Sequence, residues 1–134
     1  MQYFKNILET IGNTPLIKLN KTTESVISDV FVKVESFNPG NSVKDRMAVK
    51  MIEDAEKNGK ISPGGTIVEG TAGNTGIGLA VVCKEYDLNL KIVIPKTQSI
   101  EKKETLKKLG AELIEVEAVP YSNPKNYIKQ SKRI

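Results

Sequence analysis

The segment Thr66-Ile-Val-Glu-Gly70-Thr-Ala-Gly-Asn-Thr75-Gly-Ile-Gly78 joins a short apolar run to a glycine-rich turn. Residues 77–84 continue with apolar side chains at helical spacing, so we predict a strand, a tight turn and then a helix. Backbone N–H groups at the start of such a helix converge on one spot, and the helix dipole favours a negative charge there. The segment therefore predicts an anion-binding turn. A turn needed only to reverse the chain is the alternative.

The same alternation of strand and helix continues toward the C-terminus. Residues 90–94 and 112–116 are short segments rich in Leu, Ile and Val, which is typical of strands. Apolar residues recur at helical spacing between these two segments. We therefore expect a helix there, with Ser99 as its N-cap and Gly110 at its end. A final helix is expected within residues 125–134. This order predicts right-handed crossovers between parallel strands, so the expected fold class is α/β with a parallel βαβ sheet.

The residues upstream of the glycine-rich turn predict a hairpin and two helices. Apolar and β-branched runs at 16–19 and 30–34 are typical of short strands, which we expect to pair antiparallel. A short opening helix is expected around residues 3–8. A longer helix is expected over residues 43–57, with its two methionines in a buried stripe.

Composition limits the classes of function. The 134 residues carry a net charge of +4 and only 5% are aromatic, so nucleic acid is not an expected partner. The chain has no histidine, which excludes cysteine–histidine catalysis and histidine metal sites, and its single cysteine, Cys83, is expected in the core. No stretch approaches the ~20 apolar residues of a membrane span, and the first residues do not resemble a secretory signal. We therefore expect no membrane partner and a cytoplasmic location.

A second informative stretch is Ser36-Phe-Asn-Pro-Gly40-Asn-Ser-Val-Lys44-Asp-Arg46, a turn that runs into a helix. Ser42 is expected to cap that helix, which places Lys44 in its first turn, at the positive end of the dipole and beside Arg46. Positive surroundings penalise the charged form of a lysine and favour its action as a nucleophile. Lys44 is therefore the candidate catalytic residue. A solvated lysine without a function is the alternative.

The glycine-rich turn matches neither of two familiar phosphate-binding motifs. A P-loop requires Gly-x-x-x-x-Gly-Lys-Ser/Thr, and no lysine follows these glycines. A dinucleotide-binding turn requires Gly-x-Gly-x-x-Gly, and Val81 stands at its last position. Thr71, Asn74 and Thr75 instead place hydroxyls and an amide around the N–H groups. Such a set suits a small carboxylate.

Four motifs follow one another along the chain: Asn13-Thr-Pro-Leu16, Ser42-Val-Lys-Asp-Arg46, Glu69-Gly-Thr-Ala-Gly-Asn-Thr-Gly-Ile-Gly78 and Leu109-Gly-Ala-Glu112. Together they resemble the N-terminal part of cysteine synthase and cystathionine β-synthase, which are pyridoxal-phosphate enzymes of the tryptophan-synthase-β fold, also called fold type II. The resemblance implies that residues 41–134 form the smaller N-terminal domain of such an enzyme, incomplete here. Residues 1–40 would pack on a larger domain that the sequence does not contain.

The resemblance assigns roles to residues of both stretches. Lys44 matches the lysine that binds pyridoxal 5'-phosphate covalently and later moves the proton on the substrate Cα, and Asn74 matches the asparagine that hydrogen-bonds the cofactor's ring oxygen. Thr71, Ala72, Asn74 and Thr75 match the loop that closes on the substrate α-carboxylate. Ala72 replaces the serine that is common in this loop, which leaves the choice of thiol and of activated serine open.

The reaction implied by the resemblance is β-replacement on O-acetylserine, or on another activated serine, by sulfide or a thiol to give L-cysteine. Family members are longer homodimers. Their glycine-rich phosphate cup and the hydroxyl residue facing the pyridine nitrogen come after the point where this sequence stops. We therefore expect a truncated chain that needs the C-terminal half, holds pyridoxal phosphate weakly and is inactive alone.

Two other functions stay open at this stage. The chain would be a non-catalytic binding or assembly module if the apolar residues Leu16, Ile17, Phe31 and Val32 dock on a second polypeptide. A serine or threonine dehydratase-like lyase on the same fold is the other alternative. The Gly-Asn-Thr-Gly sequence at 73–76 disfavours it, because that sequence is closer to the β-replacement group.

Overall fold

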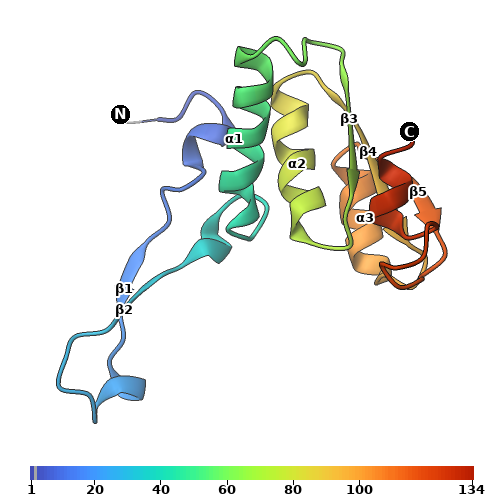
Figure 1. Ribbon diagram of the computed structural model, residues 1–134. Helices are drawn as coiled ribbons and strands as arrows, with labels where there is room; N and C mark the ends of the chain where they lie inside the picture. Colours follow the sequence, from blue (N-terminus) through green and yellow to red (C-terminus); the bar gives the residue numbers. More distant parts are fainter. Residues whose placement is uncertain (2) are drawn as a thin grey trace.

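The computed structural model of the protein describes residues 1 and 3–134 (Figure 1). Its elements, in chain order, are η1 Ile7–Thr10, β1 Leu16–Lys18, η2 Lys21–Thr23, β2 Phe31–Lys33, η3 Glu35–Phe37, α1 Lys44–Lys57, β3 Thr66–Gly70, α2 Asn74–Glu85, β4 Asn89–Pro95, α3 Ile100–Lys108, β5 Glu112–Val116 and α4 Tyr127–Ser131. The predicted strand and helix positions downstream of the glycine-rich turn are confirmed to within a few residues.

The three strands β3, β4 and β5 form one parallel sheet in the order β3-β4-β5. Each crossover contains a helix, α2 between β3 and β4 and α3 between β4 and β5. The predicted α/β class with a parallel βαβ sheet is therefore confirmed. Because the carboxyl ends of parallel strands share one edge, the loops that follow β3 and β4 lie next to each other.

Helices cover both faces of the sheet. Leu79 and Val82 of α2 and Leu106 of α3 share one buried cluster with Ile92 of β4. Gly70 of β3 faces the other way, because a Cβ atom there would meet the backbone of α4. Helix α1 forms an outer layer, packed on α2 (Figure 1). The core thus lies between α1, α2, α3 and one face of the sheet.

The predicted stripe of α1 needs correction. The buried side chains are Asp45, Ala48 and Ile52, whereas Met51 is 45% exposed and Met47 is only half-buried. Helix α1 packs mainly against one neighbour, α2, so only a narrow strip of its surface is covered. The close approach of the two helices favours the small Ala48 at the contact and leaves the methionines at its rim.

The predicted antiparallel hairpin is confirmed. Strands β1 and β2 pair with Ile17 opposite Val32, and all six of their residues are exposed. Figure 1 shows that the hairpin extends away from the α/β body. The opening helix is shorter than predicted, a single 3-10 turn whose Leu8 side chain packs against the core together with Ile11.

Candidate active site

The start of α1 presents Lys44. The Ser42 Oγ atom accepts a hydrogen bond from the Lys44 backbone N–H at 3.2 Å. The N-cap position of α1 is nevertheless Val43 and not the predicted Ser42, and Lys44 lies in the first turn as predicted. Lys44 is the first residue of α1 and therefore lies at the positive end of its dipole. The hydrogen bond to Ser42 holds the backbone of Lys44 in place at the start of the helix.

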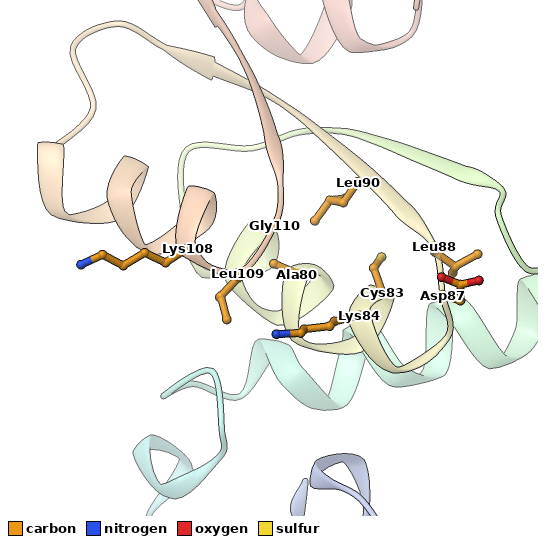
Figure 2. A pocket seen from close by; sticks show the side chains of 9 residues that line it. All are labelled: Ala80, Cys83, Lys84, Asp87, Leu88, Leu90, Lys108, Leu109 and Gly110. Atoms are coloured by element: carbon orange, nitrogen blue, oxygen red, sulfur yellow. The ribbon is translucent and has the colours of Figure 1, made fainter.

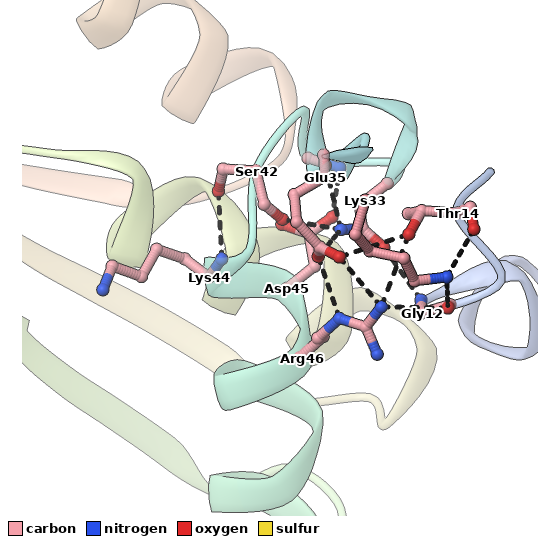
Figure 3. Close-up of polar contacts among 10 residues, drawn as sticks. Gly12, Thr14, Lys33, Glu35, Ser42, Lys44, Asp45 and Arg46 are labelled. Atoms are coloured by element: carbon pink, nitrogen blue, oxygen red, sulfur yellow. Dashed lines mark hydrogen bonds and ion pairs between the residues drawn. The ribbon is translucent and has the colours of Figure 1, made fainter. Parts of the chain in front are cut away.

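The side chain of Lys44 is exposed and its amine forms no hydrogen bond or ion pair with any residue that the structure describes. Figure 3 shows the side chain pointing away from the neighbouring cluster of Glu35 and Arg46. An exposed amine without an internal partner is available to a ligand. Arg46, by contrast, donates hydrogen bonds through Nε and Nη2 to Glu35 and to the Gly12 carbonyl.

The glycine-rich turn leads into α2 at Asn74. Gly73 stands at the N-cap position, and no side chain caps the helix there. The backbone N–H of the buried Thr71 donates to the Val93 carbonyl at 3.2 Å, and its Oγ1 accepts from the Gly73 N–H, also at 3.2 Å. The first N–H groups of α2 thus face outward from a turn that is held rigidly on its strand side. Such an uncapped helix start is an anion-binding feature.

The four predicted residues of the turn lie at different depths. Thr71 is buried, Ala72 and Thr75 are half-buried, and Asn74 is exposed. Gln98, in the loop after β4, donates a side-chain hydrogen bond to the Ala72 carbonyl. Sequence reasoning missed Gln98, because nothing in its local pattern indicates a partner 26 residues away.

Helices α1 and α2 bring Lys44 and the glycine-rich turn to the same end of the molecule. A Cβ atom on Gly78 would lie 3.1 Å from the carbonyl carbon and oxygen of Lys44, so a larger residue there would require the two helices to move slightly apart. Gly78 is about one helical turn after Asn74. The two helices also begin on the same side of the molecule (Figure 1). The lysine and the anion-binding turn therefore flank one region.

A polar cluster anchors the residues beside Lys44. Arg46 binds Glu35 through two hydrogen bonds, Nε to Oε2 at 2.8 Å and Nη2 to Oε1 at 2.9 Å, and also donates to the Gly12 carbonyl at 3.0 Å (Figure 3). The hydrogen bond from Arg46 is the main reason why the pKa of Glu35 falls to about 2. This cluster joins the N-terminal segment to α1. Sequence reasoning did not identify Glu35.

The residue after the lysine, Asp45, is fully buried. One of its carboxylate oxygens, Oδ2, accepts a hydrogen bond from the Gly40 N–H, whereas Oδ1 has no partner among the described residues. Burial raises the pKa of Asp45. A side chain on residue 40 would overlap this carboxyl group, so Gly40 is required for the turn to close over it.

A cavity of about 260 Å³ lies elsewhere, between the C-terminal ends of α2 and α3 (Figure 2). It is lined in part by Cys83, Lys84 and Lys108. Burial raises the pKa of the Cys83 thiol to about 11, so the cysteine is an unreactive core residue as predicted. The helix ends that flank this cavity are C-terminal, so it lacks the unpaired helix N–H groups that lie near Lys44. It therefore lacks the chemistry of the Lys44 region.

The described residues contain no group of three or more His, Cys, Asp or Glu side chains placed to hold a metal ion. Among the helices of residues 1 and 3–134, none combines the length and the apolar character required to span a bilayer.

Comparison with protein families assigns the chain. Residues 7–133 match the family model described as pyridoxal-phosphate dependent enzyme. The chain belongs to this pyridoxal-phosphate-dependent family. Among the curated members, cysteine synthase 1 of Neurospora crassa is 51% identical over 129 residues, which are 96% of this chain and 34% of that protein. The chain thus spans about a third of the length of this relative.

Solved structures of the family agree with this placement. A hydrogen sulfide-producing enzyme from Fusobacterium nucleatum superposes with a TM-score of 0.88 at 40% identity, over 99% of this chain and 42% of that one. An O-acetylserine dependent cystathionine beta-synthase from Helicobacter pylori gives a TM-score of 0.82 at 37% identity, over 99% and 44% of the two chains. The fold of this chain is therefore the N-terminal portion of a fold type II enzyme.

The residues at the site fit the family's cofactor. An aldehyde such as pyridoxal phosphate requires an accessible amine, which Lys44 provides. The uncapped start of α2 lies about one helical turn before Gly78, which packs against the lysine backbone, and it offers N–H groups suited to an anionic group. No residue of this sequence is assigned to the phosphate group itself.

Proposed function

We propose that the chain forms part of a cysteine synthase-like enzyme that carries out β-replacement on O-acetylserine, or on another activated serine, with sulfide or a thiol. One observation carries this proposal: Lys44, whose amine has no hydrogen-bond partner among the described residues, begins a helix whose backbone packs closely against Gly78, one turn after the uncapped, glycine-rich start of α2. An amine and an anion site at one end of the fold are what an amino-acid substrate and an aldehyde cofactor require.

Each residue of the site has a proposed role. Lys44 holds the cofactor's aldehyde carbon and moves the proton at the substrate Cα. Asn74 hydrogen-bonds the cofactor's ring oxygen, and the N–H groups of Ala72, Asn74 and Thr75 bind the substrate α-carboxylate together with the Thr71 and Thr75 hydroxyls. Ala72 contributes its N–H, because the change from serine leaves the backbone intact. The cofactor, when bound, supplies an electron-withdrawing ring that stabilises negative charge at Cα.

The proposal divides the chain as the sequence suggested. Residues 41–134 carry the site, and residues 1–40 include the exposed hairpin of β1 and β2. We propose that this hairpin packs on the remaining part of the longer family members, and that the whole protein is a homodimer. The single cysteine is buried and unpaired, which fits a cytoplasmic location.

The first prediction concerns Lys44. The 134-residue chain is incubated with pyridoxal phosphate, reduced with borohydride, digested and mapped by mass spectrometry. We expect the adduct to concentrate at Lys44, to be lost in Lys44→Ala, and to dissociate readily before reduction because no phosphate cup is present. Turnover of O-acetylserine and sulfide by this chain should be little or none.

The matched control is Lys57→Ala, which removes an exposed lysine from the last turn of the same helix. Its adduct at Lys44 should equal that of the unchanged chain. An adduct spread evenly over the exposed lysines would refute the proposed role of Lys44. Cysteine formation by the chain alone would refute the expected weak retention.

A second candidate function is a non-catalytic assembly module. The observation that favours it is the exposed apolar hairpin, where Leu16 is 64% exposed and Phe31 52%. A chain that binds a second polypeptide through this surface while failing to modify Lys44 with pyridoxal phosphate would support the module over the enzyme.

A further inference from the structure

The turn before Lys44 is built around Asn38, a fully buried side chain with an exposed fraction of 2%. Its Oδ1 atom accepts a hydrogen bond from the Gly12 N–H at 2.8 Å. Its Nδ2 group lies within 3.0 Å of three acceptors, the Ser42 carbonyl, the Glu35 carbonyl and the Glu35 carboxylate. A primary amide suits these neighbours, because its oxygen accepts from one donor while its NH₂ group donates to several acceptors.

These contacts connect three segments that are separated in the sequence. Gly12 belongs to the N-terminal segment, Glu35 follows the hairpin, and Ser42 lies just before α1. The connection ends at the lysine, because Ser42 uses its carbonyl for Asn38 and its hydroxyl for the Lys44 N–H at 3.2 Å. Asn38 is therefore two hydrogen bonds away from the backbone of Lys44.

We propose that Asn38 is a positioning residue for Lys44, which acts through Ser42 to fix the turn that presents the lysine amine. The inference rests on the proposed function of Lys44. In the part of the chain that the structure describes, Asn38 forms no hydrogen bond with the Lys44 amine or with the glycine-rich turn, so its role is indirect. Buried and fully hydrogen-bonded amides specify one backbone conformation, because any other arrangement leaves polar groups unpaired.

The variant that tests the proposal is Asn38→Asp. Aspartate has the same shape but replaces the Nδ2 donor by an acceptor that faces the carbonyls of Ser42 and Glu35. Asn38→Ala is measured beside it, because alanine removes the contacts without adding a charge. Folding of both variants is checked by circular dichroism and urea unfolding at a temperature well below the transition.

Asn126 offers a matched control. It is also a buried asparagine, 4% exposed, that joins a loop to a helix start: Nδ2 donates to the Val119 carbonyl at 2.8 Å and Oδ1 accepts from the Ile128 N–H at 3.1 Å. It caps α4, on the face of the sheet opposite to the core cluster that contains α2. Asn126→Asp should therefore destabilise the chain in a similar way without changing the turn before Lys44.

Two readouts are compared. Amide hydrogen exchange of Gly40 and Lys44 reports whether the turn is held, and the borohydride-trapped adduct at Lys44 reports whether the amine is presented. In Asn38→Asp we expect exchange at both amides to rise about tenfold and the share of adduct at Lys44 to fall about tenfold. In Asn126→Asp both quantities should stay at the values of the unchanged chain.

The outcomes separate the two proposals. If the Gly40 and Lys44 amides exchange at an unchanged rate in a folded Asn38→Asp or Asn38→Ala variant, the positioning role is overturned. It is also overturned if these amides exchange faster while the amount of adduct at Lys44 is unchanged. Equal losses in Asn38→Asp and Asn126→Asp also overturn it, because they would indicate general destabilisation. An unchanged chain that forms no selective adduct at Lys44 refutes the proposed function instead, and the exchange data then decide alone whether Asn38 holds the turn.

Discussion

The α/β body and the β1–β2 hairpin place their apolar side chains in opposite environments. In the body, Leu79 and Ile92 are fully buried between helices and sheet. In the hairpin, Leu16 and Phe31 are more than half exposed, and neither strand is longer than three residues. A two-stranded hairpin of this size is marginally stable by itself. The difference indicates that the body supplies the stability of the chain and that the hairpin supplies an apolar surface.

The two regions are joined by polar contacts. Arg46 of α1 reaches Glu35 and the Gly12 carbonyl, so the segment that carries the hairpin is attached next to Lys44. These contacts therefore link the hairpin to the start of α1. The contrast between body and hairpin, and the join between them, can each be tested by substitution.

The largest effect is expected in the body. Ile92→Ala removes a side chain with no exposed surface from the middle strand of the sheet. A buried isoleucine replaced by alanine loses transfer free energy and leaves a cavity, which costs about 2–5 kcal/mol of unfolding free energy. Urea unfolding followed by circular dichroism measures the loss.

The comparison partner for this prediction is Ile17→Ala, the same substitution in the hairpin, where Ile17 is 45% exposed. Its effect on the unfolding free energy should stay within about 0.5 kcal/mol. Equal destabilisation by the two variants would show that the hairpin belongs to the same cooperative core, and the contrast between the regions would fail.

A smaller and pH-dependent effect is expected at the join. The pKa of Glu35 is lowered from its ordinary value of 4.5 to about 2, chiefly by the hydrogen bond from Arg46. Because the folded-state pKa is the lower one, the ionised carboxylate stabilises the fold above pH 4.5, and this contribution is lost as the pH falls through about 2. Glu35→Gln should therefore be less stable than the unchanged chain near neutral pH.

The measurement is the difference in unfolding free energy between the two chains across that range of pH. The difference should be constant above pH 4.5 and shrink as the pH approaches 2. Glu85→Gln serves as the control, since Glu85 is an exposed residue at the end of α2. A pH-independent difference for Glu35→Gln would mean that the contact with Arg46 does not lower the pKa of Glu35.

The elements that sequence analysis predicted well depend on local signals. Residues 112–116 form β5 as expected, because a short segment with Leu113, Ile114 and Val116 between turn residues is typical of a strand. Ser99 caps α3, with its Oγ accepting from the Lys102 N–H at 3.5 Å. The glycine-rich turn stands between β3 and α2, where its composition placed it. Each of these features is specified by residues that are close neighbours in the sequence.

The features that sequence analysis missed depend on distant partners. Arg46 and the Gly12 carbonyl are 34 residues apart, and Gln98 reaches Ala72 across 26 residues. Periodicity also misjudged one side of α1: Met51 was expected in a buried stripe but is 45% exposed. A helix period shows that one face is apolar, yet the neighbouring helices decide how wide a strip they cover.

The smallest effect on stability is expected for the double variant Ile17→Ser/Phe31→Ser in the hairpin. Both side chains are exposed, so their removal should change the unfolding free energy by no more than about 0.5 kcal/mol. The change should instead lower self-association of the 134-residue chain, measured by light scattering over a range of concentrations, because contiguous apolar surface drives such contacts.

The control for this variant is Ile100→Ser, which removes one exposed apolar side chain from the first turn of α3, outside the hairpin. Isolated surface residues of this kind are common and carry little association energy. We therefore expect Ile100→Ser to scatter like the unchanged chain, while the hairpin variant is more nearly monomeric. If the hairpin variant associates as strongly as the control, the exposed strands are not a docking surface, and their apolar residues serve only the pairing of β1 with β2.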